Sequence, residues 1–236
     1  MKKNPIVILC GWRLTSDKYE PLRKVLKDRN YQVYIPPMPG FAENNPINRV
    51  MTLDDYVKYV ENFLISKKIT RLLLVGHSFG GRIAIKLAVK RPQLIDKLIL
   101  TGTPGYNPVR GIKIQFFLLI SKIGNFFFSV FHLSKLASSA KKVLYRLAGS
   151  SDYPQTSGYL RESFKIITRE PLENLMKQIR VPTLLVWGRE DRIVPVKIAQ
   201  RMSKVIKLSR LVIIPNSRHG VLWTEPEKFS DEVEKL

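Results

Sequence analysis

Short, continuous apolar runs alternate along the chain with longer segments in which apolar residues recur at helical spacing. Six of these runs predict β-strands, at Ile6–Cys10, Gln32–Ile35, Arg71–Val75, Lys97–Thr101, Thr183–Trp187 and Leu211–Ile214. Continuous rather than alternating apolar runs are typical of strands that are buried on both faces of a parallel sheet. Helical spacing predicts helices over Lys18–Asp28, Leu53–Ser66, Phe79–Lys90 and Val196–Val205, and a last helix beginning near Pro226.

This alternation of strands and helices predicts right-handed βαβ crossovers. The expected fold is therefore α/β, with a mostly parallel, doubly wound sheet of about six core strands. The alternation is interrupted once, because residues 105–180 contain no strand-like run. Ligands bind at the carboxyl ends of the strands in such sheets, so we interpret residues 105–180 as a helical lid insertion. Residues 1–104 and 181–236 would form the core domain.

The length and composition fit one large globular domain, or one domain with an insertion. The chain has 236 residues, of which 44% are hydrophobic and 25% are charged, as in ordinary soluble proteins. The apolar run before Gly11 is too short for the core of a signal peptide, so we interpret it as the first strand. The single cysteine, Cys10, excludes an internal disulfide and fits a reducing compartment. We therefore expect a cytoplasmic location.

The charge balance is strongly basic. Forty Lys and Arg residues against nineteen Asp and Glu give a formal net charge of +21. Such a balance attracts nucleic acid, anionic lipid and acidic substrates without specificity, and a generally basic proteome or a need for solubility would produce the same balance. The sequence contains no motif typical of nucleic-acid binding. It also lacks a metal cluster, a phosphate loop and a dinucleotide fingerprint, so we expect no nucleic-acid partner and no cofactor.

The hexapeptide GHSFGG, residues 76–81, lies between a predicted strand and a predicted helix. That context identifies G-x-S-x-G as a nucleophile elbow, a sharp turn that exposes a serine hydroxyl, here that of Ser78. The glycines leave space, because side chains beside Ser78 would collide with neighbouring backbone. The turn also places the backbone N–H of Phe79 at a helix N-terminus, where it would stabilise a developing oxyanion.

A serine nucleophile needs a base, and the chain offers three histidines. His77 is adjacent to Ser78 and should point away from it, which favours a structural role. His132 lies inside the predicted insertion and receives no role. His219 lies on a loop just after the last predicted strand, where an imidazole reaches the rim of the sheet. His219 is therefore the candidate base.

The base needs an orienting acid. Asp191 lies in the loop after the strand Thr183–Trp187, with Glu190 beside it as the rival. A solvated loop carboxylate is the ordinary alternative for either residue. The spacing of Gly188 to Asp191, followed by Val194-Pro195, favours Asp191. The chain order Ser, Asp, His, each at the carboxyl end of a strand, supports this choice.

Together these motifs resemble the α/β-hydrolase superfamily over nearly the whole chain. Residues 37–40 resemble its D-x-P-G loop, and Glu225-Pro226-Glu227 after His219 resemble its histidine loop and last helix. Residues 9–12, the oxyanion loop, resemble its H-G-x segment. The resemblance implies that the backbone N–H of Trp12 is a second oxyanion donor beside that of Phe79.

Three features depart from the family pattern. Cys10 replaces the histidine of the H-G pair, which removes a side-chain hydrogen bond that supports the oxyanion loop but removes no catalytic donor. Pro37 replaces the aspartate of the D-x-P-G loop, which puts that loop's support for the elbow in question. No antiparallel strands precede Ile6, so the sheet is shorter than the family's.

Ser78 as nucleophile excludes relatives that use an aspartate there, the haloalkane dehalogenases and epoxide hydrolases. The hypothesis is a carboxylesterase- or lipase-like serine hydrolase, in which Ser78 attacks a small-molecule ester or related acyl group, His219 removes the proton and Asp191 holds the imidazole tautomer. A C–C bond hydrolase or an acyltransferase would use the same triad. The alternative from another class is a non-catalytic lipid-surface binder.

Residues 111–131 hold six of the eleven phenylalanines, with polar residues too frequent for a membrane span. One interpretation is a lid helix that lines an apolar acyl pocket. The other is an interfacial helix, because no acidic residue occurs between Asp96 and Asp152 while eight basic residues do. An apolar face with unopposed cations is typical of peripheral contact with anionic membrane.

Overall fold

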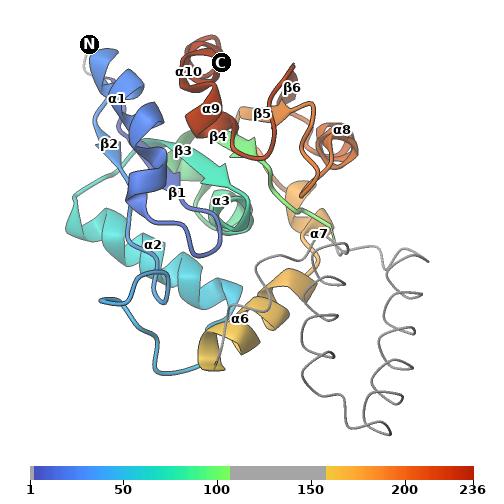
Figure 1. The fold of residues 1–236 in the computed structure, drawn as a ribbon. Coiled ribbons are helices and arrows are strands. Elements are labelled where there is room, and N and C mark those ends of the chain that lie inside the picture. The colour runs from blue at the N-terminus through green and yellow to red at the C-terminus, as the bar shows by residue number, and fades with distance from the viewer. Residues whose placement is uncertain (1–2, 107–157) are drawn as a thin grey trace, which may run out of the picture.

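The computed structural model describes residues 3–106 and 158–236 of the chain (Figure 1). Six strands form one sheet in the order β2-β1-β3-β4-β5-β6, and every pairing is parallel. This confirms the predicted sheet. The strands are β1 (Ile6–Leu9), β2 (Val33–Tyr34), β3 (Leu72–His77), β4 (Ile95–Thr101), β5 (Thr183–Gly188) and β6 (Ser209–Ile214).

Helices follow the strands in the predicted alternation. Three of them, α2 (Leu53–Ser66), α3 (Phe79–Lys90) and α8 (Val196–Val205), have the predicted bounds. The segment predicted as one helix from Lys18 begins instead as a 3-10 turn, because Pro21 fits only the first turn of an α-helix. The remaining helical elements are η1 (Ser16–Tyr19), α1 (Glu20–Asp28), η2 (Pro92–Leu94), α6 (Gly158–Arg169), α7 (Glu173–Met176), α9 (Val221–Thr224) and α10 (Pro226–Glu234).

Helices cover both faces of the sheet (Figure 1). Ile6 and Ile8 of β1 pack with buried residues of α1, α9 and α10 on one face. Val7 and Leu9 pack with α2, α3 and α8 on the other. Successive strand residues point to opposite faces, so a strand covered on both sides must be apolar throughout. The continuous apolar runs in the sequence therefore reflect burial of both faces of the sheet.

The chain reverses its direction across the sheet at β1. The strand β2 lies on one side of β1, and β3 lies on the other. The loops that follow β1 and β3 therefore leave the sheet side by side at its carboxyl edge. Such a topological switch point is the usual ligand site of a doubly wound sheet. The oxyanion loop and Ser78 both lie there.

The predicted insertion is described only in part. Its residues 158–180 contain α6 and α7, and residues 105–106 and 158–180 contain no strand. The phenylalanine-rich segment 111–131 and His132 lie outside the described residues. The lid, its acyl pocket and its contact with an anionic membrane therefore stay predictions. No helix in the described part of the chain is long and apolar enough to span a bilayer.

A buried arginine ties the described end of the predicted insertion to the helix after Ser78. Arg82 of α3 is 1% exposed. Its guanidinium donates to the carbonyls of Pro104, which follows β4, and of Ile167 and Glu170, at the end of α6. Burial lowers the pKa of Arg82 to about 10, so the group is charged at neutral pH. Helix α3 thus holds both the residue just before the predicted insertion and the end of α6 inside it.

The loop in which Pro37 replaces the family aspartate is held by tyrosines of α2. The hydroxyl of Tyr59 donates to the carbonyl of Pro37 at 2.7 Å, and that of Tyr56 donates to the carbonyl of Pro39 at 3.0 Å. The Tyr56 ring also packs edge-to-face on the Phe79 ring, with centroids 5.1 Å apart. Tyr56, which contacts both the loop and Phe79, thus connects the loop to the elbow without a carboxylate, whereas Tyr59 binds only the start of the loop.

Candidate active site

Ser78 is the single residue between β3 and α3. Its backbone angles are φ 52° and ψ −114°, in the positive-φ half of the backbone map that non-glycine residues avoid. A strained residue persists only where the surrounding structure fixes it, and such residues gather at functional sites. The N–H of Ser78 donates to the carbonyl of Thr101 at the end of β4, at 2.9 Å. The elbow predicted from residues 76–81 is therefore present.

Close packing of two backbones explains one glycine of the elbow. A Cβ atom at Gly80 would lie 2.1 Å from the carbonyl oxygen of Leu9, far inside van der Waals contact. The first turn of α3 therefore packs directly on the end of β1, as only glycine allows. This contact brings the oxyanion loop next to Ser78.

The two residues expected to supply oxyanion donors lie against each other. The rings of Trp12 and Phe79 pack edge-to-face with centroids 4.9 Å apart, and Phe41 contacts both. Within residues 3–106 and 158–236, neither the Trp12 amide nor the Phe79 amide donates a hydrogen bond. Backbone amides without a partner near a helix N-terminus are available to bind an oxyanion, and the expected role of these two residues stays a prediction.

Asp191 and His219 form the predicted acid–base pair. Asp191 Oδ2 lies 2.8 Å from His219 Nδ1, and its Oδ1 accepts the amides of Ile193 and Val194, both at 2.9 Å. Three hydrogen bonds to a carboxylate that is 5% exposed fix its orientation. The rival Glu190 is exposed. The local geometry therefore agrees with the choice of Asp191 over Glu190.

The His219 ring lies over the end of β4, the strand end that also holds the Ser78 amide. A Cβ atom at Gly102 would lie 2.6 Å from Cε1 of His219, while the neighbouring Thr101 carbonyl binds the Ser78 N–H. Since Nδ1 faces Asp191, Nε2 is the ring nitrogen left for a substrate or nucleophile. The structure thus pairs Asp191 with His219, and it places the Ser78 amide and the His219 ring against the neighbouring residues Thr101 and Gly102 at the end of β4; within the described residues no hydrogen bond joins Ser78 Oγ to His219 Nε2.

His77 is buried and binds both sides of this site. Its Nδ1 lies 2.7 Å from the hydroxyl of Tyr19, and its Nε2 lies 3.2 Å from the backbone carbonyl of His219. Burial lowers the pKa of His77 to about 3, so the ring is neutral. The structural role expected for His77 fits these contacts. No motif in the sequence indicates the role of Tyr19. The one feature that points to it is Cys10, because the oxyanion loop lacks the hydrogen bond of the usual histidine and another side chain must support it.

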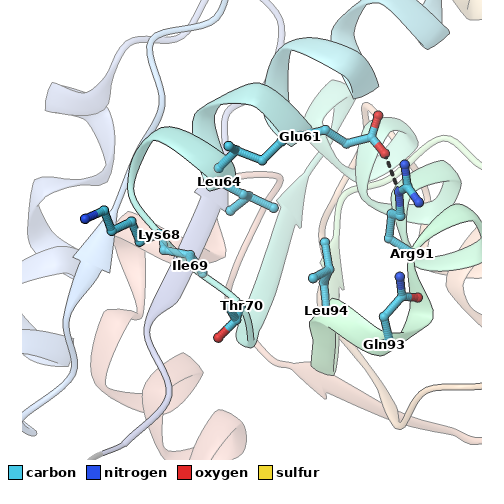
Figure 2. A pocket seen from close by; sticks show the side chains of 9 residues that line it. Glu61, Leu64, Lys68, Ile69, Thr70, Arg91, Gln93 and Leu94 are labelled. Carbon is cyan, nitrogen blue, oxygen red and sulfur yellow. Dashed lines mark hydrogen bonds and ion pairs between the residues drawn. The ribbon is translucent and has the colours of Figure 1, made fainter.

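Two surface grooves, each of about 430 Å³, differ in their relation to this site. One follows the oxyanion loop between Arg13, Phe41 and Tyr159 of α6. The other, shown in Figure 2, is lined by Leu64, Leu94 and neighbouring residues, with the Glu61–Arg91 ion pair on one side. Its residues precede β3 and β4, so it lies at the amino edge of the sheet. Only the first groove adjoins the candidate site.

No group of three or more metal-binding side chains occurs within the described ranges. The polar groups gathered at the carboxyl edge are a serine, an imidazole, a carboxylate and backbone amides. These groups suit acyl transfer through a serine nucleophile, in which a proton moves between Ser78 and His219 and no bound metal is required.

Comparison with known proteins agrees with this chemistry. A sequence model of the alpha/beta hydrolase fold matches residues 4–226. The chain is 27% identical to a pimeloyl-[acyl-carrier protein] methyl ester esterase of Shewanella woodyi, over 95% of this chain and 90% of that protein. It is also 27% identical to 2-hydroxy-6-oxononadienedioate/2-hydroxy-6-oxononatrienedioate hydrolase 2 of Pseudomonas putida, over 93% and 80%. An esterase from Exiguobacterium antarcticum has the same fold, with a TM-score of 0.74 and 22% identity over 99% of this chain and 91% of that one.

Proposed function

Since the chain belongs to the α/β-hydrolase fold family and is a hydrolase, we propose that it cleaves carboxylic esters through a Ser78–His219–Asp191 triad. The observation that carries the proposal is the 2.8 Å contact between His219 Nδ1 and the buried Asp191 carboxylate, and the strained elbow conformation of Ser78 supports it. An imidazole oriented in this way presents Nε2 as a base.

The reaction would proceed in two steps. Ser78 Oγ attacks the acyl carbon while its proton moves to His219 Nε2, and the amides of Trp12 and Phe79 bind the resulting oxyanion. The ester C–O bond then breaks, and the proton on Nε2 passes to the leaving alcohol. In the second step a water gives its proton to His219 and attacks the acyl carbon. The bond between the acyl carbon and Ser78 Oγ then breaks, and the proton on His219 Nε2 passes to Oγ, which regenerates Ser78 and releases the acid.

An ester is the substrate class that the comparisons support first, because one relative is named as a methyl ester esterase. A C–C bond hydrolase is the second candidate, because another relative is named for such a substrate at the same identity. Both reactions would use the same triad. The groove beside Phe41 and Tyr159 adjoins the oxyanion loop and is the described surface best placed to contact a substrate.

The test is the Ser78→Ala variant, assayed with a chain-length series of nitrophenyl esters and with a 2-hydroxy-6-oxodienoate. Loss of the nucleophile should lower kcat by roughly 10⁴- to 10⁶-fold. A fluorophosphonate probe should label the wild type and a Ser203→Ala control, whose changed hydroxyl lies on α8, but not Ser78→Ala. Turnover of the dienoate and not of esters would select the C–C hydrolase. Full ester hydrolysis by purified Ser78→Ala would refute the triad.

A further inference from the structure

A continuous chain of hydrogen bonds, buried at Tyr19 and partly buried at its end on His219, connects the oxyanion loop with the base. The amide of Gly11 lies 2.7 Å from the hydroxyl of Tyr19, and that hydroxyl lies 2.7 Å from His77 Nδ1. His77 Nε2 then lies 3.2 Å from the carbonyl oxygen of His219. Gly11 precedes Trp12, the expected oxyanion donor, and His219 is the expected base. Two side chains thus link two loops more than 200 residues apart in the sequence.

The direction of every proton in this chain is determined by its two ends. The Gly11 amide can only donate, and the His219 carbonyl can only accept. His77 must therefore carry its proton on Nε2, which leaves Nδ1 as an acceptor. Tyr19 must accept from Gly11 and donate to His77. Any other arrangement would leave a buried donor or acceptor without a partner, which costs about 1–3 kcal/mol.

The surroundings of the chain hold it in this single state. Tyr19 is fully buried and His77 is 1% exposed. The indole of Trp223 packs edge-to-face on both rings, with centroids 5.7 Å from Tyr19 and 5.2 Å from His77. The thiol of Cys10 also lies against the Tyr19 hydroxyl, and burial raises the thiol pKa to about 12. Neutral groups in an apolar enclosure favour the fixed pattern of donors and acceptors.

On the basis of the proposed triad, we infer that Tyr19 and His77 are positioning residues that set the distance between the oxyanion amides and the catalytic imidazole. Tyr19 supplies to the oxyanion loop the side-chain support that Cys10, in place of histidine, does not. His77 carries that support on to the backbone of His219. Neither residue touches substrate; they act through the Trp12 amide and the His219 ring.

The inference explains why a residue beside the nucleophile points away from it. A histidine at the end of β3 stands between the loop after β1 and the loop after β6, and its two nitrogens face opposite directions. An acceptor on one side and a donor on the other join the loops in a way that no aliphatic side chain can. Errors of about 1 Å in the position of a catalytic group lower rates by up to roughly a hundredfold.

The first test is Tyr19→Phe, which keeps the ring and removes the linking hydroxyl. We expect kcat for ester hydrolysis, normalised to serine titrated by fluorophosphonate, to fall about ten- to a hundredfold while KM changes by less than about threefold. The matched control is Tyr59→Phe, which removes a tyrosine hydroxyl that donates to the Pro37 carbonyl. It should keep the wild-type kcat.

The second test separates positioning from packing at His77. Glutamine carries an acceptor and a donor at a spacing similar to that of the two imidazole nitrogens, whereas methionine has a similar length and no N–H donor. His77→Met should lose kcat like Tyr19→Phe, and His77→Gln should recover at least about half of that loss on a logarithmic scale. The double variant Tyr19→Phe/His77→Met should lose little more than either single variant, because both interrupt one chain.

The outcomes separate this inference from the proposed function. If Ser78→Ala keeps its activity, the triad itself is refuted. If Ser78→Ala is inactive while titrated Tyr19→Phe keeps the wild-type kcat, or if His77→Gln and His77→Met lose kcat equally, the positioning role is refuted and the triad remains. Equal losses in Tyr19→Phe and Tyr59→Phe would also refute it, because they would show a general effect of lost stability.

Discussion

The two sides of the candidate site are held by different kinds of interaction. On the nucleophile side, backbone packing places Ser78, because the first turn of α3 presses on β1 at a position where only glycine fits. On the acid–base side, hydrogen bonds place the groups. Asp191 is bound by two amides and by His219, and the amide of Glu190 is bound by the carbonyl of Ser217 at 2.9 Å. The nucleophile side depends mainly on shape, although the Ser78 N–H also binds the Thr101 carbonyl. The acid–base side adds polar pairing to close packing, since a Cβ atom at Gly102 would lie 2.6 Å from the His219 ring.

This difference predicts different responses to substitution and to pH. A nucleophile placed by steric contact stays in position whatever the protonation of its neighbours, and it fails when volume is added. A base held by hydrogen bonds fails when a donor or an acceptor is exchanged, even where the volume of the side chain is unchanged. His77 is the last residue of β3, on the nucleophile side, and it is hydrogen-bonded to His219 on the acid–base side. Substitutions of His77 should therefore affect both sides.

The largest expected effect is on the polar side, from Asp191→Asn. Asparagine keeps the size of the side chain, but if its oxygen stays on the amides of Ile193 and Val194, its NH₂ group faces His219 Nδ1. The imidazole must then take the wrong tautomer, which should lower kcat by about 10⁴-fold with little loss of stability. Ester hydrolysis kinetics and a thermal melt measure the two quantities.

The control for Asp191→Asn is Glu190→Gln, the same chemical change one residue earlier on an exposed side chain. It should keep the wild-type kcat. If both variants lost activity equally, the loop as a whole rather than the Asp191 carboxylate would be responsible. If Asp191→Asn lost much of its thermal stability as well as its kcat, the loss of activity would not be specific to the polar pairing, and the comparison between polar pairing and shape would fail.

The second effect is on the steric side, from Gly80→Ala. Within a helix this change normally stabilises by about 1 kcal/mol. Here the new methyl would lie 2.1 Å from a backbone oxygen, and overpacking of this kind costs about 3 kcal/mol or more. Urea unfolding should show that loss, whereas Lys204→Ala on the exposed face of α8 should change little. A stabilised Gly80→Ala would show that β1 and α3 are not in contact.

The sequence predicted the parts of the fold that rest on local periodicity. The bounds of α2, α3 and α8 follow from apolar spacing, and the strands follow from continuous apolar runs that both faces of the sheet require. The elbow motif was also local, because Ser78 and its flanking glycines all lie within residues 76–81, although the need for Gly80 comes from its contact with Leu9 of β1. The start of α1 differs from the prediction, because Pro21 fits only the first turn of an α-helix.

The contacts between loops could not be predicted in the same way. Tyr19 lies in an unremarkable amphipathic segment, 58 residues from His77, and nothing near it in the sequence indicates its partner. The choice of Asp191 over Glu190 rested on spacing, whereas its physical cause is burial and the direction of two backbone amides. Such pairings depend on the topology that brings the ends of β1, β3 and β6 together, which no short window contains.

The third and smallest effect is on the pH dependence of stability. It tests His77, which is bonded to both sides of the candidate site. Burial lowers the pKa of His77 to about 3 in the folded chain, from about 6.5 when unfolded. Between about pH 6.5 and pH 3, His77 is therefore protonated in the unfolded chain and neutral in the folded chain. This contribution to stability is complete above about pH 7 and is lost as the pH falls toward 3. The loss between pH 7 and pH 5 should be about 2 kcal/mol.

Urea unfolding at pH 7 and at pH 5 isolates this contribution when His77→Gln is compared with the wild type. Glutamine does not titrate, so the variant should lose about 2 kcal/mol less stability between the two pH values. Tyr59→Phe, which leaves His77 unchanged, should keep the full wild-type dependence. Equal dependence in the wild type and His77→Gln would show that His77 takes up protons in the folded chain as readily as in the unfolded one. A protonated His77 could not accept from Tyr19, so the hydrogen-bonded connection between the nucleophile side and the acid–base side would then be broken at Nδ1.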